Sequence, residues 1–110
     1  TALSDYISRS GGTMIGTLSV PTLNVSGTLV SSNVSSGNTL PSSDNTYNLG
    51  SPSYRWANLY TADMHFSNEN TEGNIVDGTT GNWTLQEGEN DIYMLNNKTG
   101  KKYRIKLEEV

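Results

Sequence analysis

The sequence of 110 residues contains no cysteine, a single histidine (His65) and no apolar run longer than a few residues. Without cysteine the chain has no disulfide framework, no thiolate metal site and no cysteine nucleophile. Apolar runs such as Ile92 to Leu95 are far shorter than the roughly 20 residues that span a bilayer, so we expect no membrane insertion. No basic stretch followed by an apolar one marks a signal peptide. Because the chain begins at Thr1 rather than Met, we expect it to be a fragment of a longer protein.

Charge is also scarce. Charged residues make up 16% of the chain, none lies between Ser10 and Ser43, and the net charge is −4, which disfavours a nucleic-acid partner. In their place stand Ser, Thr, Asn and Gly, 51 residues in all, which favour caps, turns and strands over helix interiors. The 22 Leu, Ile, Val and Phe residues suffice only for a marginal core. We therefore expect an all-β fold that other copies of the chain complete.

Residues 1–43 are predicted to form a Ser/Thr/Gly-rich shaft of β-repeats. Residues 16–20, 21–25 and 26–30 are similar short units in which apolar and polar residues alternate, a pattern typical of half-buried strands. A repeat of five to six residues is too short for sandwich strands and favours short coils stacked along an axis, as in a β-helix. The alternative is a generic Ser/Thr-rich linker. In the shaft interpretation the trimer core consists of Leu18, Val20, Leu23, Val25 and Leu29.

Residues 44–80 are interpreted as a second module followed by a loop. Ser51 is placed to cap a single helical turn with Pro52 at its first position. Alternation of apolar and polar residues predicts a strand over 59–67. The Asn-, Glu- and Gly-rich segment 67–80 predicts a loop.

Residues 81–110 are predicted to form a small antiparallel meander of three strands, at 82–87, 91–96 and 101–108. Turns are expected at 88–90 and 97–100, with Gly100 at a positive φ. In the third strand Tyr103, Ile105 and Leu107 face one side and the basic residues the other, which suits a sheet with one wet face. This segment carries enough Tyr, Trp, Ile and Leu for a small meander of its own.

No constellation of residues indicates catalysis, so we expect no enzyme and no cofactor. No serine has a recognisable His and acid partner, and the neighbouring carboxylates lie in loops, turns or the tail. A metal site needs several copies, with His65 of three chains meeting on a threefold axis; the alternative is a solvent-facing strand residue.

The aromatic and basic residues offer the remaining candidates for binding. Tyr and Trp serve both as core residues of small β-modules and as stacking platforms for sugars. Structural roles are expected for Trp56, Tyr60 and Trp83. Candidate receptor contacts are Tyr54, Tyr93, Lys101 and Lys102, although the basic residues also suit the wet face of the last strand.

Three stretches resemble one family, the tail fibres of tailed bacteriophages. Residues 6–18 (YISRSGGTMIGTL) resemble the Gly-Gly-Thr-Met-x-Gly-x-Leu repeat of these fibres, and the Gly-Thr-Leu and Thr-Leu-Asn-Val units resemble their shaft repeats. Residues 47–51 (YNLGS) with 55–60 (RWANLY) resemble a module near the C-terminal ends of such fibres. Residues 82–88 (NWTLQEG) through 100–103 (GKKY) look like the C-terminal segment of structural proteins in phages of aquatic bacteria.

The resemblance implies an elongated, intertwined homotrimeric β-fibre with a structural and host-attachment role in the virion. Its implied partners are two further copies of the chain, other fibre or baseplate proteins, and a glycan of the host surface. In many fibres a self-cleaving chaperone domain with a Ser-Asp-x-Arg-Leu-Lys signature follows the Arg-Trp module. Here Phe66-Ser67-Asn68 follows instead, so we expect no such domain. The alternative function is a small carbohydrate-binding β-module that acts as an adhesin tip.

Overall fold

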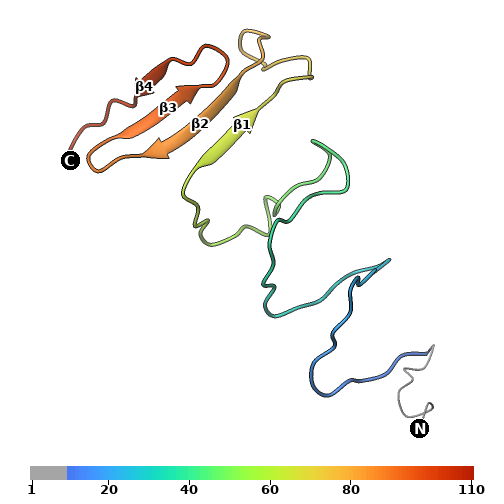
Figure 1. The fold of residues 1–110 in the computed structure, drawn as a ribbon. Helices are drawn as coiled ribbons and strands as arrows, with labels where there is room; N and C mark the ends of the chain where they lie inside the picture. The colour runs from blue at the N-terminus through green and yellow to red at the C-terminus, as the bar shows by residue number, and fades with distance from the viewer. Residues whose placement is uncertain (1–9) are drawn as a thin grey trace. The chain divides into compact units, whose positions relative to one another are not determined.

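The computed structural model describes residues 10–110, which form strands, turns and irregular segments without a helix. The chain divides into a unit that ends at Thr46 and a second unit that spans Tyr47–Val110. Regular structure among the described residues lies in the second unit (Figure 1). The all-β prediction is therefore confirmed for this part of the chain. The start of the predicted shaft, and with it the beginning of the motif at Tyr6, lies outside the described residues.

The second unit contains one antiparallel sheet of four strands in the order β1-β2-β3-β4 (Figure 1). The strands are β1 (Met64–Ser67), β2 (Asn82–Glu87), β3 (Ile92–Asn96) and β4 (Lys102–Arg104). The predicted three-stranded meander corresponds to β2, β3 and β4, but β4 is shorter than the strand predicted over residues 101–108. The sequence did not predict that β1, from the preceding module, pairs with β2 and makes the sheet four-stranded.

Strand β1 is shorter than the predicted strand over residues 59–67. Its pairing with β2 starts where Met64 lies opposite Leu85, and β2 ends only two residues later at Glu87. Residues 59–63 keep the alternating pattern but are not strand residues, because strand structure requires a hydrogen-bonded neighbour as well as a pattern.

The two turns of the meander follow from their residues. Gly88 N–H donates to the Asp91 carbonyl at 2.8 Å and closes the turn between β2 and β3. Between β3 and β4 the Asn96 side-chain oxygen accepts bonds from the Lys98 and Thr99 amides, an Asx-type turn. Gly100 lies at φ 75° and its amide bonds the Asn96 carbonyl, so the predicted positive φ at this glycine is confirmed.

The segment at Ser51 is a tight two-residue turn rather than the expected helical turn. Ser51 and Tyr54 exchange two backbone hydrogen bonds, of 3.0 and 3.2 Å, around Pro52 and Ser53. The Ser51 hydroxyl accepts a further bond from the Tyr54 amide at 3.1 Å, which is the capping contact expected of this serine. The reciprocal pair closes the chain on itself, so no helix continues from it.

Residues 10–46 contain no strand in this single chain, although the units at 16–30 predict short strands. The five residues predicted as trimer core are between 42% and 62% exposed. A strand in this segment would have unpaired backbone groups on both edges, since the single chain supplies no neighbour for it. The alternation of Leu and Val with polar residues is thus present in the sequence without a pairing partner in the structure.

Candidate functional site

The register of the sheet sorts its side chains onto two different faces. We call one the apolar face; its strand residues are Met64, Phe66, Trp83, Leu85, Ile92, Met94 and Tyr103, together with Glu87 at the end of β2 and Asn96 at the end of β3. Trp83 and Tyr103 lie on it with ring centroids 5.7 Å apart and planes tilted by 44°. Such tilted aromatic pairs stabilise a sheet by about 0.5–1.5 kcal/mol beyond the area they bury.

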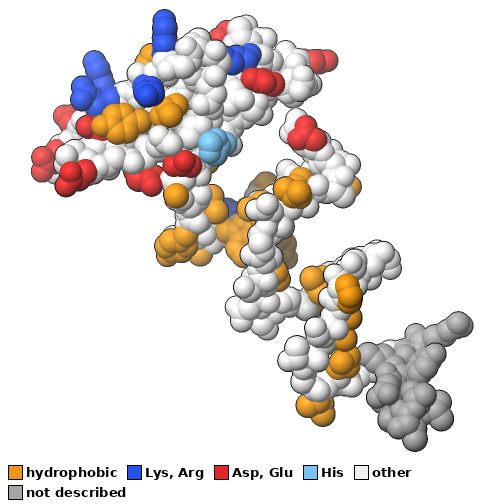
Figure 2. All heavy atoms as spheres, in the orientation of Figure 1, with side chains coloured by type: hydrophobic (Ala, Val, Ile, Leu, Met, Phe, Trp, Pro, Cys, Tyr) orange, Lys and Arg blue, Asp and Glu red, His pale blue; other side chains and the backbone are white. Residues whose placement is uncertain are grey.

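The opposite face, which we call the polar face, carries hydroxyl, amide and basic groups. Its strand residues are His65, Ser67, Asn82, Thr84, Gln86, Tyr93, Leu95, Lys102 and Arg104. In Figure 2 the Lys and Arg side chains gather over the part of the sheet where Figure 1 places β3 and β4. Of the receptor candidates, Tyr93 and Lys102 therefore share this face, whereas Lys101 lies in the adjoining turn and Tyr54 in the turn at Ser51.

A hydrogen-bonded row crosses the polar face at Thr84, which is 3% exposed and is the one buried residue among those described. The Thr84 hydroxyl lies 2.9 Å from His65 Nδ1 and accepts a bond from Asn97 Nδ2 at 3.0 Å. Asn97 Nδ2 also donates to Asn82 Oδ1 at 2.9 Å. This row joins β1, β2 and the turn after β3, and it satisfies its polar groups within the chain.

The row also bears on the candidate metal ligand. One ring nitrogen of His65 is occupied by Thr84, which leaves Nε2 as the free position of the imidazole. Within residues 10–110 no cluster of three or more His, Cys, Asp or Glu side chains is arranged to hold a metal ion. A site built by one imidazole from each of three chains stays a prediction.

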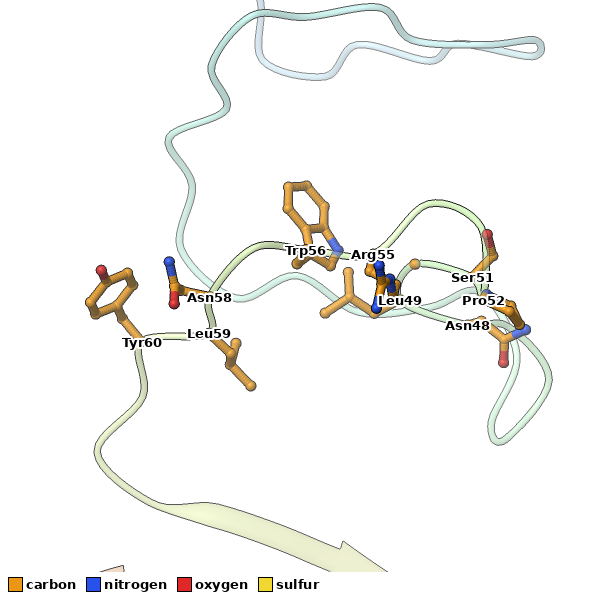
Figure 3. Close-up of a pocket in the computed structure, with 10 residues that line it drawn as sticks. Asn48, Leu49, Ser51, Pro52, Arg55, Trp56, Asn58, Leu59 and Tyr60 are labelled. Atoms are coloured by element: carbon orange, nitrogen blue, oxygen red, sulfur yellow. The ribbon is translucent and has the colours of Figure 1, made fainter.

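A second candidate is an open hollow of about 760 Å³ formed by residues 48–60, within the segment that contains the YNLGS and RWANLY motifs (Figure 3). Apolar side chains of Leu49, Pro52, Trp56, Leu59 and Tyr60 line it together with polar groups of the same module. Its size is typical of small-ligand sites, but those bury most of their ligand, and here Trp56 is 69% and Tyr60 91% exposed. The hollow is a shallow surface suited to a sugar ring or to a side chain of another chain.

Gly50 shapes this module. It lies at φ 79°, and a Cβ there would come 3.1 Å from the Tyr54 carbonyl oxygen and 3.4 Å from the Trp56 ring. The glycine thus allows the turn at Ser51 and the indole to approach the same stretch of backbone.

The loop between β1 and β2 agrees with the loop predicted over residues 67–80, but the sequence did not predict the hydrogen bonds within it. Asp77 Oδ1 accepts three hydrogen bonds of 2.7 to 3.0 Å, from the Asn74 amide group and from the amide and hydroxyl of Thr79. These bonds hold the pKa of the Asp77 carboxyl below its ordinary value of 3.8, the Thr79 hydroxyl contributing most. Between these hydrogen-bonded residues, Ile75 and Val76 are both almost fully exposed to solvent.

The sequence signal for the hydrogen bonds within this loop is weak. Residues 74–79 (NIVDGT) combine Asx-turn formers and glycine around two apolar residues, which is turn chemistry. Only the structure shows that the polar residues of the loop hydrogen-bond to one another and that Ile75 and Val76 remain exposed to solvent.

Comparison with known proteins identifies no relative: no family model, curated protein or solved structure matches this chain. None of the described residues belongs to a helix long and apolar enough to cross a membrane. The site geometry and the sequence resemblance therefore carry the functional argument.

Proposed function

We propose that the chain is a structural part of a tailed-phage tail fibre or related virion fibre, and that it contributes to host attachment as an intertwined homotrimer. The proposal assigns it no enzymatic activity, cofactor, nucleic-acid partner or membrane insertion. Its further partners are neighbouring fibre or baseplate proteins and a glycan of the host surface, and it acts outside the cell as part of the virion.

One observation carries the proposal: no hydrophobic side chain among residues 10–110 is fully buried. A soluble monomer of this size depends on a hydrophobic core for its stability. The Leu and Val residues of segment 16–30 recur in alternation yet stay exposed, as expected of a strand whose neighbours come from other chains.

In the proposed shaft, three chains close one another's strand edges and pool their few apolar side chains around Leu18, Val20, Leu23, Val25 and Leu29. A β-helix-like wrapping suits a unit of five to six residues. The absence of charge between Ser10 and Ser43 supports this arrangement, because identical charges near a threefold axis would repel one another.

The test is the mass of the chain in solution at micromolar concentration, measured by light scattering. We expect three times the 11.9 kDa of the single chain. A clean monomer at that concentration would refute the fibre proposal.

A carbohydrate-binding role at the fibre tip is the second candidate, favoured by the shared position of Tyr93 and Lys102 on the polar face. Tyr93 is 37% exposed there, opposite Arg104 in the register, and offers an aromatic surface beside polar groups. If a glycan stacks on this ring, Tyr93→Ala weakens binding on a glycan array about 30-fold, since a stacking aromatic contributes about 2 kcal/mol. Tyr47→Ala, at an exposed tyrosine outside the sheet, is the matched control and leaves binding unchanged.

A further inference from the structure

The apolar face of the sheet is uncovered in the single chain. Phe66 is 44% exposed, Tyr103 47% and Ile92 37%, although they share this face with the half-buried Trp83 and Leu85. The four strands form a single layer, and a layer with one apolar face needs a second layer against it.

We infer that this face packs against the same face of other copies of the chain. The inference rests on the proposed homotrimer and assigns its contact in residues 64–105, a region that the predicted trimer core at residues 18–29 does not include.

The distribution of charge favours a second copy as the occupant. Lys102 and Arg104, two of the three charged residues in the strands, lie on the polar face, and the third, Glu87, lies on the apolar face but exposed, at the last position of β2. A contact between polar faces would remove Lys102, Arg104 and the Asp91 carboxylate 4.0 Å from Arg104 from water, which is costly. Copies that meet through their apolar faces bring mainly apolar and aromatic side chains together, because Glu87 and Asn96 are the last residues of their strands.

The area of the face points the same way. Four strands about 4.8 Å apart and about five residues long cover roughly 19 Å by 17 Å, on the order of 300 Å². A stable interface usually needs about 800 Å² from each partner, so a separate protein that covered only this face would bind weakly. Another copy also brings the exposed Leu and Val residues of segment 16–30, which extend the contact area without a new partner.

The polar face, by contrast, is complete without a partner layer. The Thr84 row satisfies its own hydrogen bonds, and Gln86 Nε2 donates to Asp63 Oδ2 at 3.1 Å. Because His65 lies on this face, packing through the apolar face keeps the three imidazoles away from the contact. The inferred packing and a threefold histidine site therefore exclude each other.

The test uses two single-cysteine variants in a chain that has no other cysteine. Met94→Cys lies on the apolar face and Leu95→Cys on the polar face; they are neighbours in β3, and both positions are half-buried in the single chain. Each full-length variant is treated with a maleimide under native conditions, and its mass is measured on the same sample. We expect the cysteine at position 94 to react at least tenfold more slowly than the cysteine at 95 in the assembled protein.

The outcomes separate this inference from the fibre proposal. A trimer in which both cysteines react equally fast overturns the inference and leaves the fibre proposal standing. A monomer overturns both, even if position 94 is protected, because the face would then be covered within one chain. If Met94→Cys prevents assembly, a second variant tests the same face. Trp56→Phe leaves Trp83 as the only tryptophan, and we expect iodide to quench the Trp83 fluorescence only weakly in the trimer. Strong quenching there refutes the packing.

Discussion

Replacement of Gly73 by alanine should open the loop between β1 and β2, and its cost follows from the backbone. Gly73 lies at φ 96°, where an L-residue is strained by about 1–3 kcal/mol. A Cβ at this position would lie 2.6 Å from the Gly78 carbonyl carbon and closer still to its oxygen. No flexible side chain can move aside to make room, because both atoms belong to the backbone.

Relief of this overlap requires the two sides of the loop to separate. They are joined by the bond from the Asn74 amide to the Thr79 carbonyl at 3.0 Å and by that from the Gly78 amide to the Asn74 carbonyl at 3.1 Å. Each such bond contributes about 0.5–1.5 kcal/mol, so their loss adds about 1–3 kcal/mol to the strain at Gly73. The loop should therefore be destabilised by about 4 kcal/mol in total.

Gly78→Ala is the matched control in the same loop. Gly78 also has a positive φ, of 72°, but a Cβ there meets nothing within 4 Å. Its substitution should cost only the conformational strain, about 1–2 kcal/mol. The assay is hydrogen exchange at the backbone amides of positions 78 and 79, with the backbone amide of Leu85 in β2 as an internal reference. Gly73→Ala should exchange at least tenfold faster than Gly78→Ala at these amides, and equal exchange in the two variants would refute the steric argument.

Two further predictions concern assembly and pH. Val25→Asp should prevent assembly, because three carboxylates would meet in the proposed trimer core, whereas Asn24→Asp at the neighbouring position should still give trimers by light scattering. Normal trimers from Val25→Asp would contradict the shaft. The lowered pKa of Asp77 means that its bonds stabilise the loop at pH values above 3.8 and that this contribution is lost as the pH falls through the lower pKa of the folded state. The NMR chemical shift of the Thr79 amide, followed against pH, should therefore report a midpoint for Asp77 below pH 3.8. A midpoint at or above that value would contradict the hydrogen bonds between Asp77 and Thr79.

The sequence predicted the C-terminal sheet well because its signals are local. Alternation over residues 82–87 and the glycine at position 100 report directly on a pleated strand and on a turn that needs a positive φ. The side assigned to Tyr103 relative to its basic neighbours in β4 also agrees with the register. These features depend on residues within a few positions of one another.

The features that the sequence could not predict depend on pairing between distant residues. Strand β1 begins at Met64 because its pairing with β2 begins there, opposite Leu85. No property of residues 59–63 indicates this boundary. The hydrogen bonds of the Thr84 hydroxyl join residues 19 and 13 positions away, so no local pattern marks this threonine as the buried residue of the sheet. The helical turn predicted at Ser51 was wrong for a local reason, because Tyr54 pairs back with Ser51 through two backbone hydrogen bonds.

The absence of a buried hydrophobic side chain among residues 10–110 links folding to assembly. Ordering the backbone costs about 1–2 kcal/mol per residue, and a net hydrogen bond returns only about 0.5–1.5 kcal/mol. Burial of a large apolar side chain adds about 1.5–3 kcal/mol, a gain that Phe66 and Tyr103 obtain only when another layer covers them. The stability of a trimer formed in this way depends on protomer concentration, so a tenfold dilution should lower it by about 2.8 kcal/mol of trimer, two association steps of about 1.4 kcal/mol each. A thermal midpoint that stays the same over a hundredfold range of concentration would show that the chain is stable without its copies.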